Sequence, residues 1–154
     1  ELSSRYNIDL KTKTVLDFFA RDGSWQTKYY AEKVKKLHAW EIDPIHKYNL
    51  KKNLPNGTDI VIGDSFDISK KEKQTFDMIV IDNPMGCYGH NNEYCEHFEV
   101  LDLVPRLLRR KGLLIFNVKL QPFSYKENIQ WQERRNSFYS QADCSNLSKK
   151  FIYY

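Results

Sequence analysis

The segment from Thr14 to Ser24 reads TVLDFFARDGS, and it decides the fold of this chain. It begins with a run of apolar and β-branched residues, which is typical of a buried strand. It ends with Arg21-Asp22-Gly23-Ser24, in which small residues allow a sharp turn. We therefore predict a strand over Thr14–Phe19, followed by a loop whose backbone can approach a ligand.

Further apolar runs lie on the C-terminal side of this segment. They predict four more strands, at His38–Ile42, Thr58–Ile62, Phe76–Ile81 and Gly112–Val118. The stretches between them predict helices at Gln26–Leu37, Pro44–Leu54 and Asn92–Arg110. Strands that alternate with helices indicate βαβ units. The predicted fold class is α/β: a three-layer αβα sandwich around a mainly parallel sheet of five or six strands.

The composition is that of a globular chain. Its 154 residues are 41% hydrophobic and 29% charged, which excludes a disordered or fibrous protein. Apolar runs stay far below the ~20 residues that a membrane-spanning helix needs. Three cysteines are too few for a disulfide framework, so we predict a reduced, cytoplasmic setting. The net charge of +4 permits an anionic partner without requiring one.

The residues just after each predicted strand carry the chemistry, because ligands of parallel sheets bind outside the carboxyl ends of the strands. Acid or amide groups follow each of the first four strands: Asp17 and Asp22, Glu41, Asp64, and Asp82-Asn83. Glu41 can accept hydrogen bonds from both hydroxyls of a ribose, whereas Asp43 is the expected N-cap of the next helix. Asp64 could accept one from an adenine amino group. Together these carboxylates predict an adenosine site.

These blocks resemble the motifs of class I S-adenosylmethionine-dependent methyltransferases, a Rossmann-like family, over roughly residues 13–120. Val15–Ser24 resembles the first motif, whose loop wraps the methionine part of the cofactor, and Gly63–Phe66 resembles the adenine-binding motif. Phe76–Pro84 resembles the fourth-strand motif beside the transferred methyl group, and Leu107–Ile115 resembles the usual lead into strand five. The resemblance implies S-adenosyl-L-methionine as cofactor, bound by Asp17, Phe19, Ala20, Asp22, Gly23, Glu41, Ile42, Asp64, Ser65, Phe66 and Asp82.

The fourth motif is nearest to that of amino-group methyltransferases that act on nucleic-acid bases. In that group an amide and the following carbonyl accept the target amino hydrogens, and an aromatic ring stacks on the base. Asn83-Pro84 keeps this start, whereas Met85-Gly86 replaces the second proline and the aromatic residue; Tyr88 could supply the ring. The resemblance therefore implies a DNA or RNA substrate and four catalytic residues: Asp82, Asn83, Pro84 and Tyr88.

Two departures from the family pattern leave an alternative open. Arg21 stands where the first motif usually has glycine, and Met85-Gly86 alters the fourth motif. A methyltransferase-like module that binds the cofactor or a partner without transferring methyl would tolerate both changes. A nicotinamide-binding dehydrogenase is a third hypothesis, but such an enzyme typically has a GxGxxG loop, which this chain lacks.

Other regions suggest contacts with nucleic acid or metal. Ser124–Asp143 interleaves aromatic and basic residues and could contact a nucleic-acid substrate, or it could be an ordinary surface insertion. The basic residues of Arg106–Lys111 suit either phosphate contacts or a helix C-terminus. Four potential metal ligands lie close together in the sequence: Cys87, His90, Cys95 and His97. Their spacing does not match that of a structural zinc site, and Cys95 and His97 should point apart on the predicted helix. We therefore predict no metal site.

We predict a single Rossmann-like domain over residues 1–154. The cofactor-binding core is expected at 14–122, the substrate-contact insertion at 124–143, and the start of a helix or an edge strand at 144–154. A class I sheet normally closes with an antiparallel hairpin, so the resemblance implies an incomplete C-terminal hairpin. Either two strands are missing, or Phe151–Tyr154 is a sixth strand. A partner chain or a missing segment would then cover the exposed sheet edge.

Overall fold

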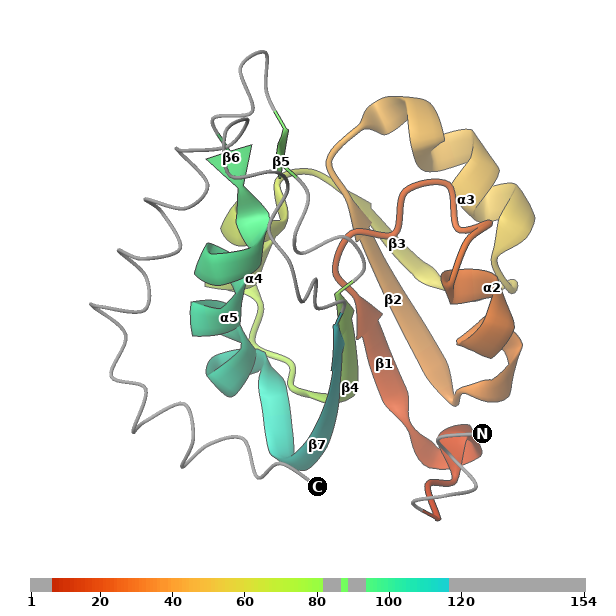
Figure 1. Cartoon of the computed structure of the whole chain (residues 1–154). Helices are drawn as coiled ribbons and strands as arrows, with labels where there is room; N and C mark the ends of the chain where they lie inside the picture. Colours follow the sequence, from red (N-terminus) through yellow and green to blue (C-terminus); the bar gives the residue numbers. More distant parts are fainter. Residues whose placement is uncertain (1–6, 82–86, 89–93, 117–154) are drawn as a thin grey trace, which may run out of the picture. The chain divides into compact units, whose positions relative to one another are not determined.

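The computed structural model describes residues 7–81, 87–88 and 94–116 (Figure 1). They form a five-stranded sheet with the order β3-β2-β1-β4-β7 and a separate two-stranded sheet, β5-β6. The strands of the larger sheet are all parallel and span Thr14–Asp17 (β1), Lys36–Glu41 (β2), Asp59–Ile62 (β3), Phe76–Ile81 (β4) and Leu108–Phe116 (β7). The smaller sheet pairs Cys87–Tyr88 (β5) with Tyr94–Cys95 (β6) in antiparallel fashion.

Helices and single 3-10 turns connect the strands. They are η1 (Leu10–Thr12), α2 (Thr27–Tyr30), η2 (Ala31–Lys33), η3 (Pro44–His46), α3 (Lys47–Asn53), α4 (Ser65–Lys71) and α5 (Glu96–Leu107). Figure 1 shows α2 and α3 on one face of the larger sheet and α4 on the other. A parallel sheet with helices on both faces confirms the predicted α/β, three-layer class. The strand over Phe76–Ile81 and the Asp43 N-cap, which accepts the Ile45 N–H, are also confirmed.

The chain divides into two compact units. One comprises residues 1–82 and 106–116 and holds the five-stranded sheet; the other comprises 83–105 and 117–154. Within α5 the buried residues Val100, Val104 and Leu107 recur at helical spacing, which makes this helix amphipathic. The predicted insertion, the terminal helix and the candidate sixth strand lie outside the described residues.

The central strands of the larger sheet are buried on both faces. One face belongs to an aliphatic cluster that includes Val15, Leu50 and Met78. The other face carries rings in edge-to-face contact, with centroid distances of 5.3 Å between Phe18 and Trp40 and 6.2 Å between Trp40 and Phe76. Burial on both faces explains why these strands read as nearly continuous apolar runs rather than as alternating patterns.

Two of the predicted boundaries that are wrong show how strand pairing decides where an element begins or ends. The helix predicted over Gln26–Leu37 ends early, because β2 begins at Lys36 and pairs Leu37, which is 3% exposed, with Val15 of β1. Strand pairing and burial here override helix propensity. The fifth strand begins at Leu108 rather than at Gly112, because Leu108 already pairs with β4. A register shift follows, and Lys111 within it has a φ of 68°.

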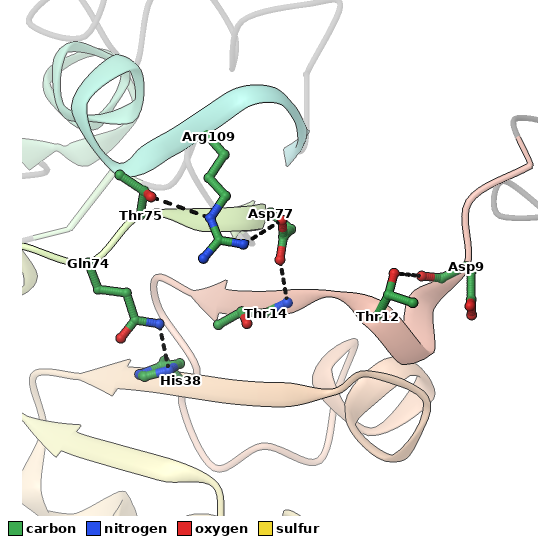
Figure 2. Close-up of polar contacts among 8 residues, drawn as sticks. All are labelled: Asp9, Thr12, Thr14, His38, Gln74, Thr75, Asp77 and Arg109. Atoms are coloured by element: carbon green, nitrogen blue, oxygen red, sulfur yellow. Dashed lines mark hydrogen bonds and ion pairs between the residues drawn. The ribbon is translucent and has the colours of Figure 1, made fainter.

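A polar network closes the amino edge of the sheet, where the parallel strands begin (Figure 2). Arg109 Nη1 donates to Asp77 Oδ1 at 2.8 Å, and Asp77 Oδ2 accepts the Thr14 N–H at 2.8 Å. This chain of contacts ties β7 to β4 and β4 to β1. Arg106 donates to the carbonyls of Ser69 and Glu72 at the end of α4. Arg106 and Arg109 therefore serve the fold, which weakens the alternative that they contact phosphates.

No helix among the described residues is both long and apolar enough to cross a membrane. Within the same residues, no group of three or more histidine, cysteine, aspartate or glutamate side chains could hold a metal ion.

Candidate functional site

The loops after β1, β2 and β3 are held together at the carboxyl edge of the sheet. The Ala20 N–H donates to the Trp40 carbonyl at 2.9 Å, and the Gly63 N–H donates to the Glu41 carbonyl at 2.8 Å. These bonds extend the ladder beyond the strands into the loops. The sheet order also changes direction between β1 and β4, and such a switch point is where open parallel sheets bind ligands.

Glu41 lies at this edge, at the end of β2 between β1 and β3, and is 7% exposed. Its Oε2 accepts the Arg21 N–H at 2.7 Å and its Oε1 accepts the Asp43 N–H at 2.8 Å. The carboxylate thus joins the loop after β1 to the loop after β2. An ionised carboxylate has about four acceptor positions, so Glu41 keeps capacity for hydroxyl donors from a ligand. The residue therefore fits the ribose of the expected cofactor.

Asp17 anchors α2 to the end of β1. Its side chain is 2% exposed, and Oδ2 accepts hydrogen bonds from Thr27 Oγ1 at 2.6 Å and from the Tyr30 hydroxyl at 2.7 Å. Sequence reasoning missed Thr27 and Tyr30. The signal was present, because two hydroxyl side chains three residues apart share one face of a helix that directly follows a buried acid.

The first-motif loop is shaped by its own polar contacts and by α3. Asp22 Oδ1 accepts the Ser24 N–H at 3.1 Å and the Ser24 hydroxyl at 2.8 Å, and these bonds lower the pKa of Asp22. Gly23 has a φ of 73°, and a Cβ atom on it would lie 2.9 Å from the Leu54 side chain. Arg21 has a φ of 51°, so the loop holds a non-glycine residue in a costly conformation. Gly23 is therefore required by the backbone and by the packing of Leu54.

The remaining cofactor-site candidates differ in exposure. Asp64 is exposed and caps α4 by accepting the Phe66 N–H at 2.8 Å. Ser65 is 3% exposed and donates its hydroxyl to the Phe18 carbonyl at 2.9 Å, so it positions the loop after β1. Ile42, beside Glu41, is 59% exposed, which leaves an apolar surface at the edge. Phe19 is half-buried.

A pocket of about 440 Å³ lies between the end of β3 and α4. It is lined by Val61, Gly63, Asp64, Asp67, Ile68, Lys71 and Glu72. Its lining shares Asp64 with the candidate site, but neither Glu41 nor the first-motif loop contributes to it. Because β3 is the edge strand of the sheet, this pocket is peripheral to the strand ends that carry Asp17 and Glu41.

The predicted catalytic residues are not brought together within the described structure. Asp82, Asn83 and Pro84 lie outside the described residues, and Tyr88 belongs to β5 in the second unit. The expectation that Cys95 lies on a helix is wrong. It belongs to β6, where its register partner is Cys87.

No protein-family model and no curated protein matches the sequence. Solved structures do match. The candidate methyltransferase yhhF of Escherichia coli is 15% identical, with a TM-score of 0.59 over 79% of this chain and 68% of that one. A candidate O-methyltransferase of Klebsiella pneumoniae is 18% identical, with a TM-score of 0.63 over 92% and 67%. An rRNA methylase of Streptococcus thermophilus is 11% identical, with a TM-score of 0.56 over 82% and 72%.

These similarities establish the fold: the chain has a Rossmann-like architecture, which it shares with these structures. The order of the strands, the parallel pairing and the loops at the carboxyl edge all agree with the resemblance drawn from the sequence motifs. Identities below one fifth show the architecture, and the chemistry has to be argued from the residues.

Proposed function

We propose that this chain is an S-adenosylmethionine-dependent methyltransferase that acts on an exocyclic amino group of a nucleic-acid base. The observation that carries the proposal is the position of Glu41. It places a nearly buried carboxylate at the carboxyl end of β2, joined to the loop after β1 and beside the β1–β4 switch point. A carboxylate at this point is suited to accept hydrogen bonds from both hydroxyls of a ribose.

The neighbouring residues supply the rest of an adenosine site. The exposed side chain of Ile42 offers an apolar contact for an adenine ring, and the exposed carboxylate of Asp64 can accept from its amino group. The loop Arg21–Ser24 lies where the methionine part of the cofactor would bind. When bound, S-adenosylmethionine supplies a methyl group activated by a sulfonium.

The choice of an amino group as the target rests on Asn83-Pro84, which directly follows β4 in the sequence. In the proposed mechanism the Asn83 side chain and the Pro84 carbonyl accept the amine hydrogens, and they thereby orient the nitrogen lone pair for in-line attack. Asp82 takes the proton that leaves the amine. Tyr88 stacks on the base. The choice of a nucleic-acid target rests on the resemblance of Asn83-Pro84 to the motif of amino-group methyltransferases.

One observation favours a second candidate function, a module that binds cofactor or partner without methyl transfer. Both oxygens of Glu41 already accept backbone N–H groups, and one of these belongs to Arg21, the residue that departs from the family pattern. Such a site could be maintained as a scaffold. The two functions differ in methyl transfer, and the methyltransferase shares cofactor binding with the cofactor-binding form of the module.

Calorimetric titration with S-adenosylhomocysteine tests the shared part. We expect saturable binding that Glu41→Ala abolishes, because the variant removes the ribose acceptor and releases both loops. Glu32→Ala is the matched control, since Glu32 is an exposed glutamate on η2. Absence of binding by the wild-type chain would refute the methyltransferase proposal and leave only a module that binds a partner.

Transfer of a labelled methyl group to bulk RNA, DNA or protein then separates the two functions. The methyltransferase proposal predicts label in RNA or DNA, retained cofactor binding in Asn83→Ala, and loss of label in that variant. Cofactor binding without label in any polymer would favour the non-catalytic module. Label in protein alone would replace the nucleic-acid target.

A further inference from the structure

The exposed apolar side chains of the described residues are concentrated in one short stretch. All five large ones fall between residues 25 and 48: Trp25 (62% exposed), Tyr29 (67%), Ile42 (59%), Ile45 (73%) and Tyr48 (75%). Three of the five are aromatic. The same fold buries Trp40 and Phe76 almost fully. The three exposed rings therefore point to a role other than packing.

A cation accompanies each of the three rings. The Arg21 guanidinium lies 5.5 Å from the centre of the Trp25 ring, and Lys28 Nζ lies 5.1 Å from that of Tyr29. On α3, Lys52 follows Tyr48 by four residues, which places both on the same face of the helix. That face points away from the core, because both residues are exposed whereas Leu50 is fully buried.

These residues belong to adjoining elements. Asn53 Nδ2, at the end of α3, donates to the Asp22 carbonyl at 2.8 Å, and Leu54 fills the space beside Gly23. Figure 1 shows α2 and α3 on the same face of the sheet. We define the α2–α3 surface as Arg21, Trp25, Lys28, Tyr29, Tyr48 and Lys52.

This part of the chain is also strongly basic. Residues 21–54 contain eight lysines and arginines and four acids, a net charge of +4 that equals that of the entire chain. Three of those acids are engaged locally: Glu41 is nearly buried, and Asp22 and Asp43 accept backbone N–H groups of their own loops. No lysine or arginine of this stretch is in an ion pair within the described part of the chain.

We propose that the α2–α3 surface binds single-stranded nucleic acid, with bases stacked on the exposed rings and phosphates held by the adjacent cations. The inference rests on the proposed function for its identification of the polymer as the substrate. Interleaved cations and aromatic rings are the recognition chemistry of unpaired strands, because every base has a face that can stack and every nucleotide carries a negative charge. An acidic protein would match the charge but would not explain the three exposed rings.

The surface adjoins the candidate site directly. Arg21 contributes its side chain to the surface and its N–H to Glu41 Oε2. A strand bound along α2 and α3 therefore reaches the carboxyl edge of the sheet, where the methyl donor is proposed to bind.

Fluorescence anisotropy with two labelled 12-nucleotide probes tests the proposal: an unpaired RNA strand and an abasic strand with the same phosphates. Tyr29→Ala with Tyr48→Ala should weaken binding of the RNA about tenfold or more, with little effect on the abasic strand. Lys28→Glu with Lys52→Glu should weaken the binding of both probes. It should also flatten the plot of log affinity against log salt, since each lost phosphate contact removes about 0.7 from the slope for a single strand.

Lys71→Glu with Lys73→Glu is the charge-matched control, because both lysines are exposed and lie outside residues 21–54. This control should bind the RNA probe more tightly than the Lys28/Lys52 variant does. Equal binding by the two charge variants, or equal effects of the tyrosine variant on both probes, would overturn the proposal. Tighter binding of polyglutamate than of RNA would point to an acidic protein instead.

The result of this test can be told apart from the results that test the proposed function. Strand binding is measured without cofactor, whereas the proposed function depends on S-adenosylhomocysteine binding and on methyl transfer. Loss of strand binding in the tyrosine variant with normal S-adenosylhomocysteine binding would support this inference, even if no methyl transfer is found.

Discussion

The two edges of the parallel sheet use carboxylates in different ways. At the amino edge, Asp77 is bound by the Arg109 guanidinium at 2.8 Å and by the Thr14 N–H. At the carboxyl edge, Glu41, Asp43 and Asp64 accept neutral backbone N–H groups, and none of the three is in an ion pair within the described residues. A cation of the chain itself pairs with Asp77, whereas none pairs with the three carboxylates at the carboxyl edge within the described residues.

This difference separates stability from function. A carboxylate that is paired with a guanidinium contributes to the stability of the fold and has few acceptor positions free for a ligand. A carboxylate held by amides is oriented without being neutralised, which is the arrangement that a hydroxyl-binding site requires. We therefore expect substitutions at the amino edge to change stability alone and those at the carboxyl edge to change stability and binding together.

The largest expected effect on stability and binding together is that of Glu41→Gln. Glutamine has one acceptor oxygen and turns its amide hydrogens toward the second N–H donor, so one buried donor is left without an acceptor. We expect the free energy of unfolding to fall by about 2–4 kcal/mol and the affinity for S-adenosylhomocysteine to fall tenfold or more. Urea unfolding and calorimetry measure the two quantities.

Asp77→Asn is the matched amide substitution at the other edge of the sheet. It should lower stability while leaving the affinity for S-adenosylhomocysteine within twofold of wild type. If Asp77→Asn weakens binding as much as Glu41→Gln does, the division between the two edges is wrong.

A pair of glycine substitutions sharpens the comparison through packing. Gly23 at the carboxyl edge and Gly57, which precedes β3 at the amino edge, both have positive φ values, of 73° and 90°. A Cβ atom on Gly23 would lie 2.9 Å from Leu54, whereas one on Gly57 would meet nothing within 4 Å. We expect Gly57→Ala to lower the free energy of unfolding by about 1–2 kcal/mol, because alanine is strained at this backbone conformation. Gly23→Ala should lower it by about 1–3 kcal/mol more, because the added methyl group also overpacks against Leu54. Equal losses in thermal unfolding would show that Leu54 moves aside freely.

Acid unfolding tests the amino edge. Burial raises the pKa of Asp77, but the Thr14 N–H and the Arg109 guanidinium outweigh it, so the pKa lies below its usual value. The ionised form is therefore favoured in the folded state, and its stabilisation is lost as pH falls from about 4 through the lower folded pKa. The difference in unfolding free energy between wild type and Asp77→Asn should be about 1–3 kcal/mol at pH 6 and should shrink steadily as the pH falls below about 4.

The control for this titration is Asp67→Asn, because Asp67 also pairs with a cation, Lys70, but both side chains are more than 60% exposed. Exposed pairs contribute little to stability. If Asp67→Asn loses as much pH-dependent stability as Asp77→Asn does, the ion pair between Asp77 and Arg109 stabilises the fold no more than an exposed pair.

The sequence predicted the fold well where burial on both faces produced continuous apolar runs, as in Phe76–Ile81. It failed where tertiary contacts decide a boundary. Lys36 and Leu37 read as helical because lysine and leucine favour helices, yet pairing with β1 places them in β2. Leu108–Arg110 read as the end of a helix, yet pairing with β4 and the contact between Arg109 and Asp77 make this stretch part of a strand.

The candidate site divides in the same way. Chemical type and position after a strand predicted Glu41 and Asp17, and both lie at the carboxyl edge of the sheet. The sequence could not show that Glu41 binds the N–H of Arg21, because that bond depends on how two loops far apart in the chain fold over neighbouring strands. The exposed rings on α2 and α3 were missed for a related reason, since composition does not reveal which face of a short helix is buried.

The smallest expected effect is the titration of His38 on β2, which is 6% exposed. Burial lowers its pKa, and Asp59, whose Oδ2 lies 3.1 Å from His38 Nδ1, partly opposes the shift. The unfolded chain therefore binds the proton more readily, so stability should fall as pH drops below about 6.5, with a slope under about 1.4 kcal/mol per pH unit. His38→Gln should remove this slope from urea unfolding measured between pH 7.5 and pH 5.5. Asp59→Asn should instead steepen it, because the carboxylate that favours the protonated ring is gone. A shallower slope in Asp59→Asn would mean that Asp59 holds His38 in place rather than tuning its charge, and the amino edge would then rely on Asp77 alone for its electrostatic contribution.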